Sequence, residues 1–278
     1  MYICFVCNAE TEAMKKGLIP SYTDVPTAEG LSKVRETAEY IVEIIDDVMN
    51  KKPVKSADGF GDRMENVEVY LYSGDQIACA QTSMVLAEVF KKHGLLSDKN
   101  MFFCQHLNGR IYGDVEGLPQ KEVKSLKYAL KKPKHTISYM LADAGFDNAA
   151  HIESTERYAN GVFRFLKAIN VEYDLNDDAV VVVSSTPDFF KSMQTHRDVR
   201  HLCYSGANPK ECSIAPCDII HPGDLRFVEV NMLKAMPKYE MWAWDEDFLR
   251  FETRKFPKEI VDMIDEKVNA SGYSKGEE

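Results

Sequence analysis

The chain has 278 residues, of which 45% are hydrophobic and 28% are charged, with 34 basic against 44 acidic side chains. This mixture excludes a disordered or fibrous chain. The net charge of -10 argues against nucleic acid or an anionic membrane surface as the partner, because both require a cationic surface.

Apolar periodicity predicts strands and helices that alternate along the chain. In chain order these are a strand at Tyr2–Val6, a helix at Ala28–Asn50, a strand at Val67–Tyr72, a helix at Gln81–His93, a strand at Met101–His106, a helix at Thr155–Ile169, a strand at Ala179–Val183, a helix at Pro187–Met193, a strand at Leu225–Val230 and a helix at Pro257–Val268. The unbroken run Ala179–Val183 is typical of a strand buried on both faces of a sheet. The alternation predicts an α/β fold, a three-layer sandwich with a mainly parallel central sheet.

Two segments stand apart from this alternation. Residues 116–150 carry prolines and many lysines, which predicts a small solvated cap or insertion. After residue 235, the aromatic residues around Trp242 precede the last helix, and they either pack against the domain or form a contact patch. We therefore expect one domain over residues 1–235, with a cap at about 116–150, and a C-terminal extension over 236–278.

The seven cysteines make an odd and irregularly spaced set. No basic flank precedes the first apolar stretch, so a secretory signal is not expected, and reduced thiols in the cytoplasm are the simplest interpretation. The sequence contains no run of 18 apolar residues, so we expect no membrane-spanning helix. Cys4 and Cys7 lie three apart in a predicted strand and should point to opposite faces, so we expect no metal site there and no cofactor.

Several short segments, spread over about residues 2–235, resemble motifs of the histidine phosphatase superfamily, which includes phosphoglycerate mutases and acid phosphatases. The first is Val6–Glu12, which reads Val-Cys-Asn-Ala-Glu-Thr-Glu where that family usually has Val-Arg-His-Gly-Glu-Thr. The others follow in family order and are Asp24–Gly30, Tyr72–Thr82, Leu107–Gly117, Glu153-Ser154, Val182–Ser185 and Cys212–Ile214. The resemblance implies a phosphoglycerate mutase-like fold, with its site at the carboxyl ends of the strands.

The catalytic positions that the resemblance implies all depart from the family pattern. The nucleophilic histidine falls on Asn8 and the arginine before it on Cys7, while the second arginine, the acid and the second histidine fall on Ala78, Gly109 and Ser185. An amide cannot take up a phosphoryl group as an imidazole does, and loss of a nucleophile alone costs about 10⁶ in rate. The loss of both arginines removes the forks that match phosphate. We call these five residues the degenerate site.

The favoured hypothesis is a catalytically inactive protein that acts as a binding, scaffolding or assembly component. Its partner is then another protein or a second copy of the chain. The hypothesis rests on the preserved framework, such as the pair Gln81-Thr82, beside the loss of the charged residues. Buried arginines without a phosphate would be unpaired and destabilising, which favours small neutral replacements.

Two alternatives use the degenerate site itself. In the first, the chain is a divergent phosphatase or hydrolase that uses Cys7 as the nucleophile, with Ser185 or His106 close by. In the second, the site holds a small neutral ligand. Asn8 and Ser185 would then be hydrogen-bond donors, and Thr11 and Thr186 would complete the predicted pocket.

Overall fold

The fold was analysed in a computed structural model. It describes residues 2–51, 67–123, 153, 155–173, 179–195, 222–223, 225–229 and 253–271. Within these ranges, none of the helices is long and apolar enough to cross a membrane.

Within the described residues, six strands form one sheet in the order β5-β1-β4-β2-β3-β6. Their bounds are β1 (Tyr2–Cys7), β2 (Glu68–Ser73), β3 (Met101–Cys104), β4 (Ala179–Ser185), β5 (Leu225–Glu229) and β6 (Thr253–Lys255). The inner pairs β1–β4, β4–β2 and β2–β3 are parallel, while the outer strands β5 and β6 pair antiparallel. The predicted α/β class with a mainly parallel sheet is confirmed.

The central strand β4 explains the run of valines. All seven of its residues are buried. Val181 and Val183 join the apolar cluster on one face of the sheet, and Val180 and Val182 join the cluster on the other face. Because both faces are covered, the strand has no polar alternation.

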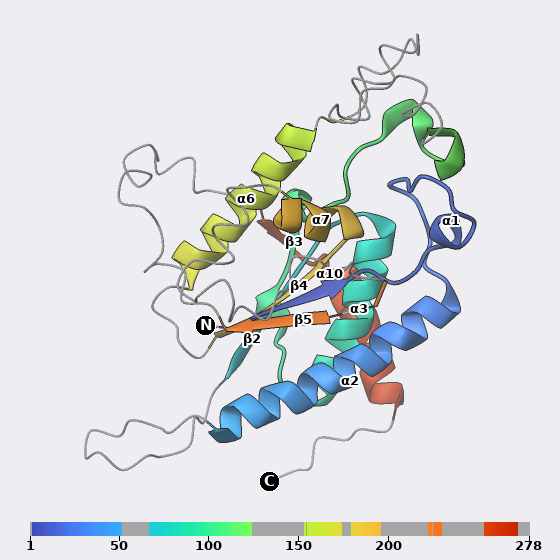
Figure 1. The fold of residues 1–278 in the computed structure, drawn as a ribbon. Helices are drawn as coiled ribbons and strands as arrows, with labels where there is room; N and C mark the ends of the chain where they lie inside the picture. Colours follow the sequence, from blue (N-terminus) through green and yellow to red (C-terminus); the bar gives the residue numbers. More distant parts are fainter. Residues whose placement is uncertain are drawn as a thin grey trace, which may run out of the picture.

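Helices cover both faces of the sheet, as the predicted three-layer sandwich requires (Figure 1). They are α1 (Glu12–Lys15), α2 (Ala28–Lys51), α3 (Ile77–Lys92), α6 (Thr155–Glu172), α7 (Pro187–Thr195) and α10 (Lys258–Ala270), with short 3-10 turns η1 (Asp98–Asn100), η2 (Gln105–Leu107) and η3 (Gly113–Val115). Residues of α6 and α7 pack on one face, and residues of α2, α3 and α10 pack on the other.

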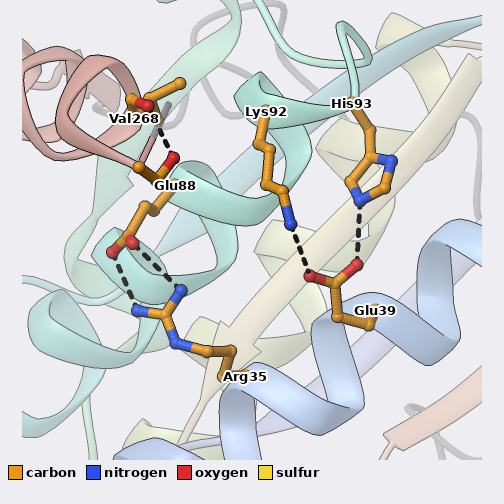
Figure 2. Close-up of polar contacts among 7 residues, drawn as sticks. Arg35, Glu39, Glu88, Lys92, His93 and Val268 are labelled. Atoms are coloured by element: carbon orange, nitrogen blue, oxygen red, sulfur yellow. Dashed lines mark hydrogen bonds and ion pairs between the residues drawn. The ribbon is translucent and has the colours of Figure 1, made fainter. Parts of the chain in front are cut away.

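Polar pairs align α2 with α3 beside their apolar contact (Figure 2). Both terminal nitrogens of Arg35 donate to the carboxylate of Glu88, at 2.9 and 3.0 Å. One turn further along α2, Glu39 lies 3.5 Å from the Lys92 ammonium and 2.8 Å from the His93 ring nitrogen. The Glu39 pairs are exposed and contribute little stability, whereas the Arg35–Glu88 pair is bidentate and its carboxylate is only 16% exposed, so it adds to the apolar contact between the two helices.

Several predicted boundaries are wrong by a few residues, and α6, for example, ends at Glu172 rather than at Ile169. Helix α3 begins at Ile77 rather than at Gln81, which places Ala78 in its first turn. The start was missed because Gln76 makes no side-chain capping bond and the first turn has no acidic residue, so neither usual start signal is present. Strand β3 ends at Cys104, and His106 lies in the following 3-10 turn.

The C-terminal residues complete the same sheet and core. Strand β6 pairs with β3, and Phe256 stacks on Phe103 with ring centroids 4.1 Å apart. Val261 and Ile264 of α10 are buried in the cluster that contains α3. The predicted domain boundary at residue 235 and the aromatic segment around Trp242 lie outside the described residues.

The predicted cap is described only at its beginning, because residues 124–152 lie outside the described ranges. That beginning is not fully solvated. Val123 is buried in a small apolar cluster with Ile19, Tyr112 and Val115. The segment therefore starts as a packed layer over the loop that follows α1.

Candidate functional site

Three residues of the degenerate site meet where β1 and β4 end. Cys7 and Ser185 are the last paired residues of these parallel strands. The backbone N–H of Asn8 donates to the carbonyl of Ser185 at 2.8 Å. The parallel pairing thus sets Asn8 beside Ser185.

Ala78 reaches the same place through a threonine one turn further along α3. The hydroxyl of Thr82 donates to the carbonyl of Ala78 at 2.7 Å and accepts from the N–H of Ala9 at 2.9 Å. Thr82 is fully buried, so this link fixes the first turn of α3 against the residue that follows Asn8.

Gly109 joins the cluster through the side chain of Gln76. The Gln76 amide spans the glycine backbone, because its Oε1 accepts from the Gly109 N–H at 2.7 Å and its Nε2 donates to the Gly109 carbonyl at 3.4 Å. A Cβ atom at position 109 would lie 3.1 Å from Gln76 Oε1 and 3.1 Å from Thr186 Cγ2. The Gln76 amide therefore packs against the backbone of Gly109, and we call this arrangement the Gln76 plug.

Every residue of the degenerate site is buried, and none carries a charged group. Cys7 is 0% exposed and belongs to the apolar cluster that contains Phe5 and Phe189. A reactive thiol needs access to solvent and a cation or helix N-terminus that stabilises the thiolate. The surroundings of Cys7 therefore favour a structural side chain over a nucleophile.

The hydrogen-bond donors predicted for a neutral ligand are used within the chain. Asn8 Nδ2 donates to the Ala9 carbonyl at 2.8 Å, and the Ser185 hydroxyl donates to the Leu107 carbonyl at 2.7 Å. Asn8 Oδ1 is buried and has no hydrogen-bond partner among the described residues. Thr11 caps α1, because its hydroxyl accepts from the N–H of Met14 at 3.2 Å. Asn8 Oδ1 thus offers a ligand an acceptor rather than the predicted donor.

A polar network around Asp75 forms the rim of the degenerate site. Asp75 Oδ1 accepts from the Tyr22 hydroxyl at 2.8 Å and from Asn108 Nδ2 at 2.6 Å, and Oδ2 accepts from Arg254 Nη2 at 2.9 Å. Burial, and then the bond to Asp75, raise the pKa of Tyr22 to about 12. The carboxylate thereby ties the loop before α2, the segment after β3 and the edge strand β6 to the start of α3.

Sequence reasoning missed Gln76, Asn108 and Arg254. Gln76 had a visible signal. The segment Tyr72–Thr82 resembles the family motif Ser-x-Asp-Leu-x-Arg-Ala-x-Gln-Thr, and Gln76 stands at the leucine of that motif. Arg254 had none, since the three residues of β6 are all exposed and show no pattern.

Two other sequence predictions have clear geometry. Cys4 and Cys7 belong to apolar clusters on opposite faces of the sheet, so they cannot share a metal ion. Within the described ranges, no group of three or more potential metal ligands occurs. His106 lies against α6, where a Cβ on Gly161 would be 3.0 Å from its Nδ1.

No family model and no curated protein matches the chain. Among solved structures, a phosphoglycerate mutase from Thermus thermophilus is 17% identical over 82% of this chain and 93% of its own, with a TM-score of 0.45. YhfR from Bacillus stearothermophilus is 11% identical over 83% and 91%, with a TM-score of 0.49. A phosphoserine phosphatase mutant from Entamoeba histolytica is 16% identical over 69% and 76%, with a TM-score of 0.43. Nothing about the activity of this chain follows from these similarities.

Proposed function

We propose that this chain is a catalytically inactive histidine phosphatase-like protein that serves as a binding, scaffolding or assembly component. The Gln76 plug carries the proposal, because a neutral amide binds the Gly109 backbone where the resemblance implies the acid, and a Cβ on Gly109 would lie 3.1 Å from that amide. The nucleophile position is held by Asn8, whose amide nitrogen already donates to a neighbouring carbonyl. At the carboxyl edge of the sheet, neutral side chains that pack and hydrogen-bond within the chain therefore stand where the resemblance implies catalytic groups.

The composition of the degenerate site fits a role in stability. Small neutral residues avoid the cost of burying arginines that have no phosphate to pair with. We propose that the functional contacts lie on the outer surface, with another protein or a second copy as the partner, in the cytoplasm. Light scattering over a range of concentrations separates the two partners. A mass that rises with concentration supports self-association. A mass that stays at the monomer value supports a different protein as the partner.

Hydrolysis of p-nitrophenyl phosphate tests the absence of turnover. We expect the wild-type chain and the Asn8→Ala variant to release product at the same rate as buffer. Activity from a contaminating phosphatase would remain in the preparation of the variant. Turnover that is present in the wild type and lost in Asn8→Ala overturns the proposal.

Site-resolved labelling with iodoacetamide tests chemistry at Cys7. Burial raises the pKa of Cys79 and of Cys104 to about 12, so these two thiols serve as internal references for a protected cysteine. We expect Cys7 to label as slowly as the references in the native chain and all three to label rapidly in urea. Fast native labelling of Cys7 alone, with an apparent pKa below about 8.5, would favour the thiol-dependent alternative.

A further inference from the structure

A chemically labile dipeptide lies at the rim of the degenerate site. In an Asn-Gly pair, the glycine has no side chain to hinder attack of its backbone nitrogen on the asparagine side-chain carbon. The attack forms a C–N bond, closes a succinimide ring and expels ammonia, and water then opens the ring to aspartate or isoaspartate. The chain has two such pairs, Asn108-Gly109 at the rim and Asn160-Gly161 within α6.

All four polar atoms of Asn108 have partners. Its N–H donates to the Gln105 carbonyl at 3.0 Å, and its carbonyl accepts from the Tyr158 hydroxyl at 2.9 Å. In the side chain, Oδ1 accepts from the Gln76 N–H at 3.1 Å and Nδ2 donates to Asp75 Oδ1 at 2.6 Å. The amide is therefore held at both ends, and it cannot rotate toward the next backbone nitrogen without losing these bonds.

The attacking group is held as well. The Gly109 N–H, which must lose its proton before it can attack, donates to Gln76 Oε1 at 2.7 Å. Both Gln76 and Gly109 are buried, so hydroxide has little access to this proton. One glutamine thus contacts both halves of the labile pair, through its backbone and through its side chain.

The packing around positions 108 and 109 favours this Asn-Gly pair. A Cβ at position 109 would be a tight fit, 3.1 Å from Gln76 Oε1, and Gly74 approaches Asn108 so closely that a Cβ on Gly74 would lie 2.5 Å from Asn108 Oδ1. The side chain of Asn108 also supplies both the acceptor for the Gln76 N–H and the donor for Asp75. The contacts of the plug therefore favour asparagine followed by glycine.

We infer that Asn108 is a latent deamidation site and that Gln76 and Asp75 keep it intact. Deamidation replaces the Nδ2 donor with a carboxylate oxygen that faces Asp75 Oδ1, where like charges repel. The modification would separate the segment after β3 from the start of α3 and loosen the rim. The inference does not depend on whether the chain is catalytic.

Peptide mass mapping after prolonged incubation at mildly alkaline pH tests this inference. In the native wild type we expect Asn108 to deamidate many-fold more slowly than in the same chain unfolded in urea. The Gln76→Leu variant removes both side-chain bonds to Gly109, and we expect it to speed deamidation of Asn108 several-fold while Asn160 is unchanged. Gln120→Leu is the matched control, because it removes one hydrogen bond to Leu18 elsewhere and should leave the rate at Asn108 unchanged.

Asn160 reports on global unfolding in the same sample. If Gln76→Leu fails to fold, both asparagines accelerate together, and the comparison of native with unfolded wild type decides. Equal rates at Asn108 in native and unfolded wild type overturn the inference. So does a folded Gln76→Leu variant in which Asn108 stays as slow as in the wild type.

Discussion

The backbone of Gly109 lies between two side chains, Gln76 and Thr186, at contact distances of 3.1 Å for an added Cβ. We expect Gly109→Ala to lower the free energy of unfolding by about 1–3 kcal/mol, as overpacking usually does. In the Gln76→Ala background the same change should cost less, because the amide that it meets is gone. Urea denaturation of the two single variants and the double variant gives this coupling. Equal costs in the two backgrounds would contradict the plug.

A charge at position 108 tests the rim in a second way. We expect Asn108→Asp to destabilise the chain at pH 7 by about 1–3 kcal/mol, because a donor is lost beside a carboxylate. Asp75 disfavours ionisation of the new carboxyl and so raises its pKa in the folded state above the unfolded value of about 3.9. The free energy of unfolding of Asn108→Asp is therefore highest below the unfolded-state pKa of this carboxyl group, and it falls as the pH rises through the folded-state pKa. Thermal unfolding between pH 3.5 and pH 7 should show this trend in Asn108→Asp relative to Asn108→Ala.

For single residues, the sequence predicted which charged side chains are missing better than it predicted which side chains pack in their place. The sequence alone shows that neither Asn8 nor Gly109 carries an ionisable group, because residue type decides it. It does not show that Gln76 packs against Gly109, since that depends on the distance between β2 and the segment after β3. The same limit applies to Ser185, which was expected to face a ligand and instead donates to Leu107.

Helix α3 is tied to the C-terminal segment at both ends. Near its start, Asp75 pairs with Arg254, and near its end the ammonium of Lys91 lies 2.6 Å from both Asp98 and Asp265. The Lys91 side chain is 7% exposed, whereas the two aspartates are 62% and 44% exposed. The lysine is therefore the buried member of the cluster and joins α3 to α10.

We expect Lys91→Met to lower the free energy of unfolding by about 1–2 kcal/mol, because hydrogen bonds to charged groups are lost while the exposed aspartates regain water. Lys267→Met changes an exposed lysine of α10 and is the control, with an effect within about 0.5 kcal/mol. Hydrogen exchange of the α10 amides should accelerate in Lys91→Met alone. Unchanged exchange would show that Phe256, Val261 and Ile264 hold the segment without the ion pairs.

Apolar periodicity predicted the long elements of the fold but not the short polar strand β6. The bounds of α2 and the central place of β4 follow from long apolar stripes, and both were predicted. The pairing of β6 with β3 was not, because Thr253–Lys255 is short and polar and shows no apolar alternation.

For the whole molecule, buried neutral acids predict a loss of stability in alkali. Burial raises the pKa of Cys79 and Cys104 from 9.0 to about 12 and, as the largest cause, that of Tyr70 and Tyr72 from 10.0 to about 12. Stability from these groups is complete below pH 9 and is lost as the pH rises toward 12, since the unfolded chain ionises first. Guanidinium denaturation at pH 7, 9 and 10.5 should give a falling midpoint above pH 9. A constant midpoint would contradict the burial of these groups.

Restoring the residues that the resembled family has at the degenerate site tests the proposed inactivity. We expect a chain with Cys7→Arg, Asn8→His, Ala78→Arg, Gly109→Glu and Ser185→His to remain inactive and unstable while Gln76 packs against position 109. Adding Gln76→Leu should recover stability relative to the fivefold variant. Urea midpoints and p-nitrophenyl phosphate turnover measure the two effects. Activity in the fivefold variant without the sixth change would show that the plug is no obstacle.

The order of the strands also has a consequence for synthesis. The four inner strands are all present once residue 185 has been translated, yet both outer strands come from residues 225–255. A nascent chain on the ribosome therefore carries a parallel sheet with two open borders for at least forty more codons, as the distance from Ser185 to Leu225 requires. Unpaired borders attract other strands. This protein should consequently depend on chaperones late in translation, and premature stop codons between these strands should yield aggregates rather than soluble fragments.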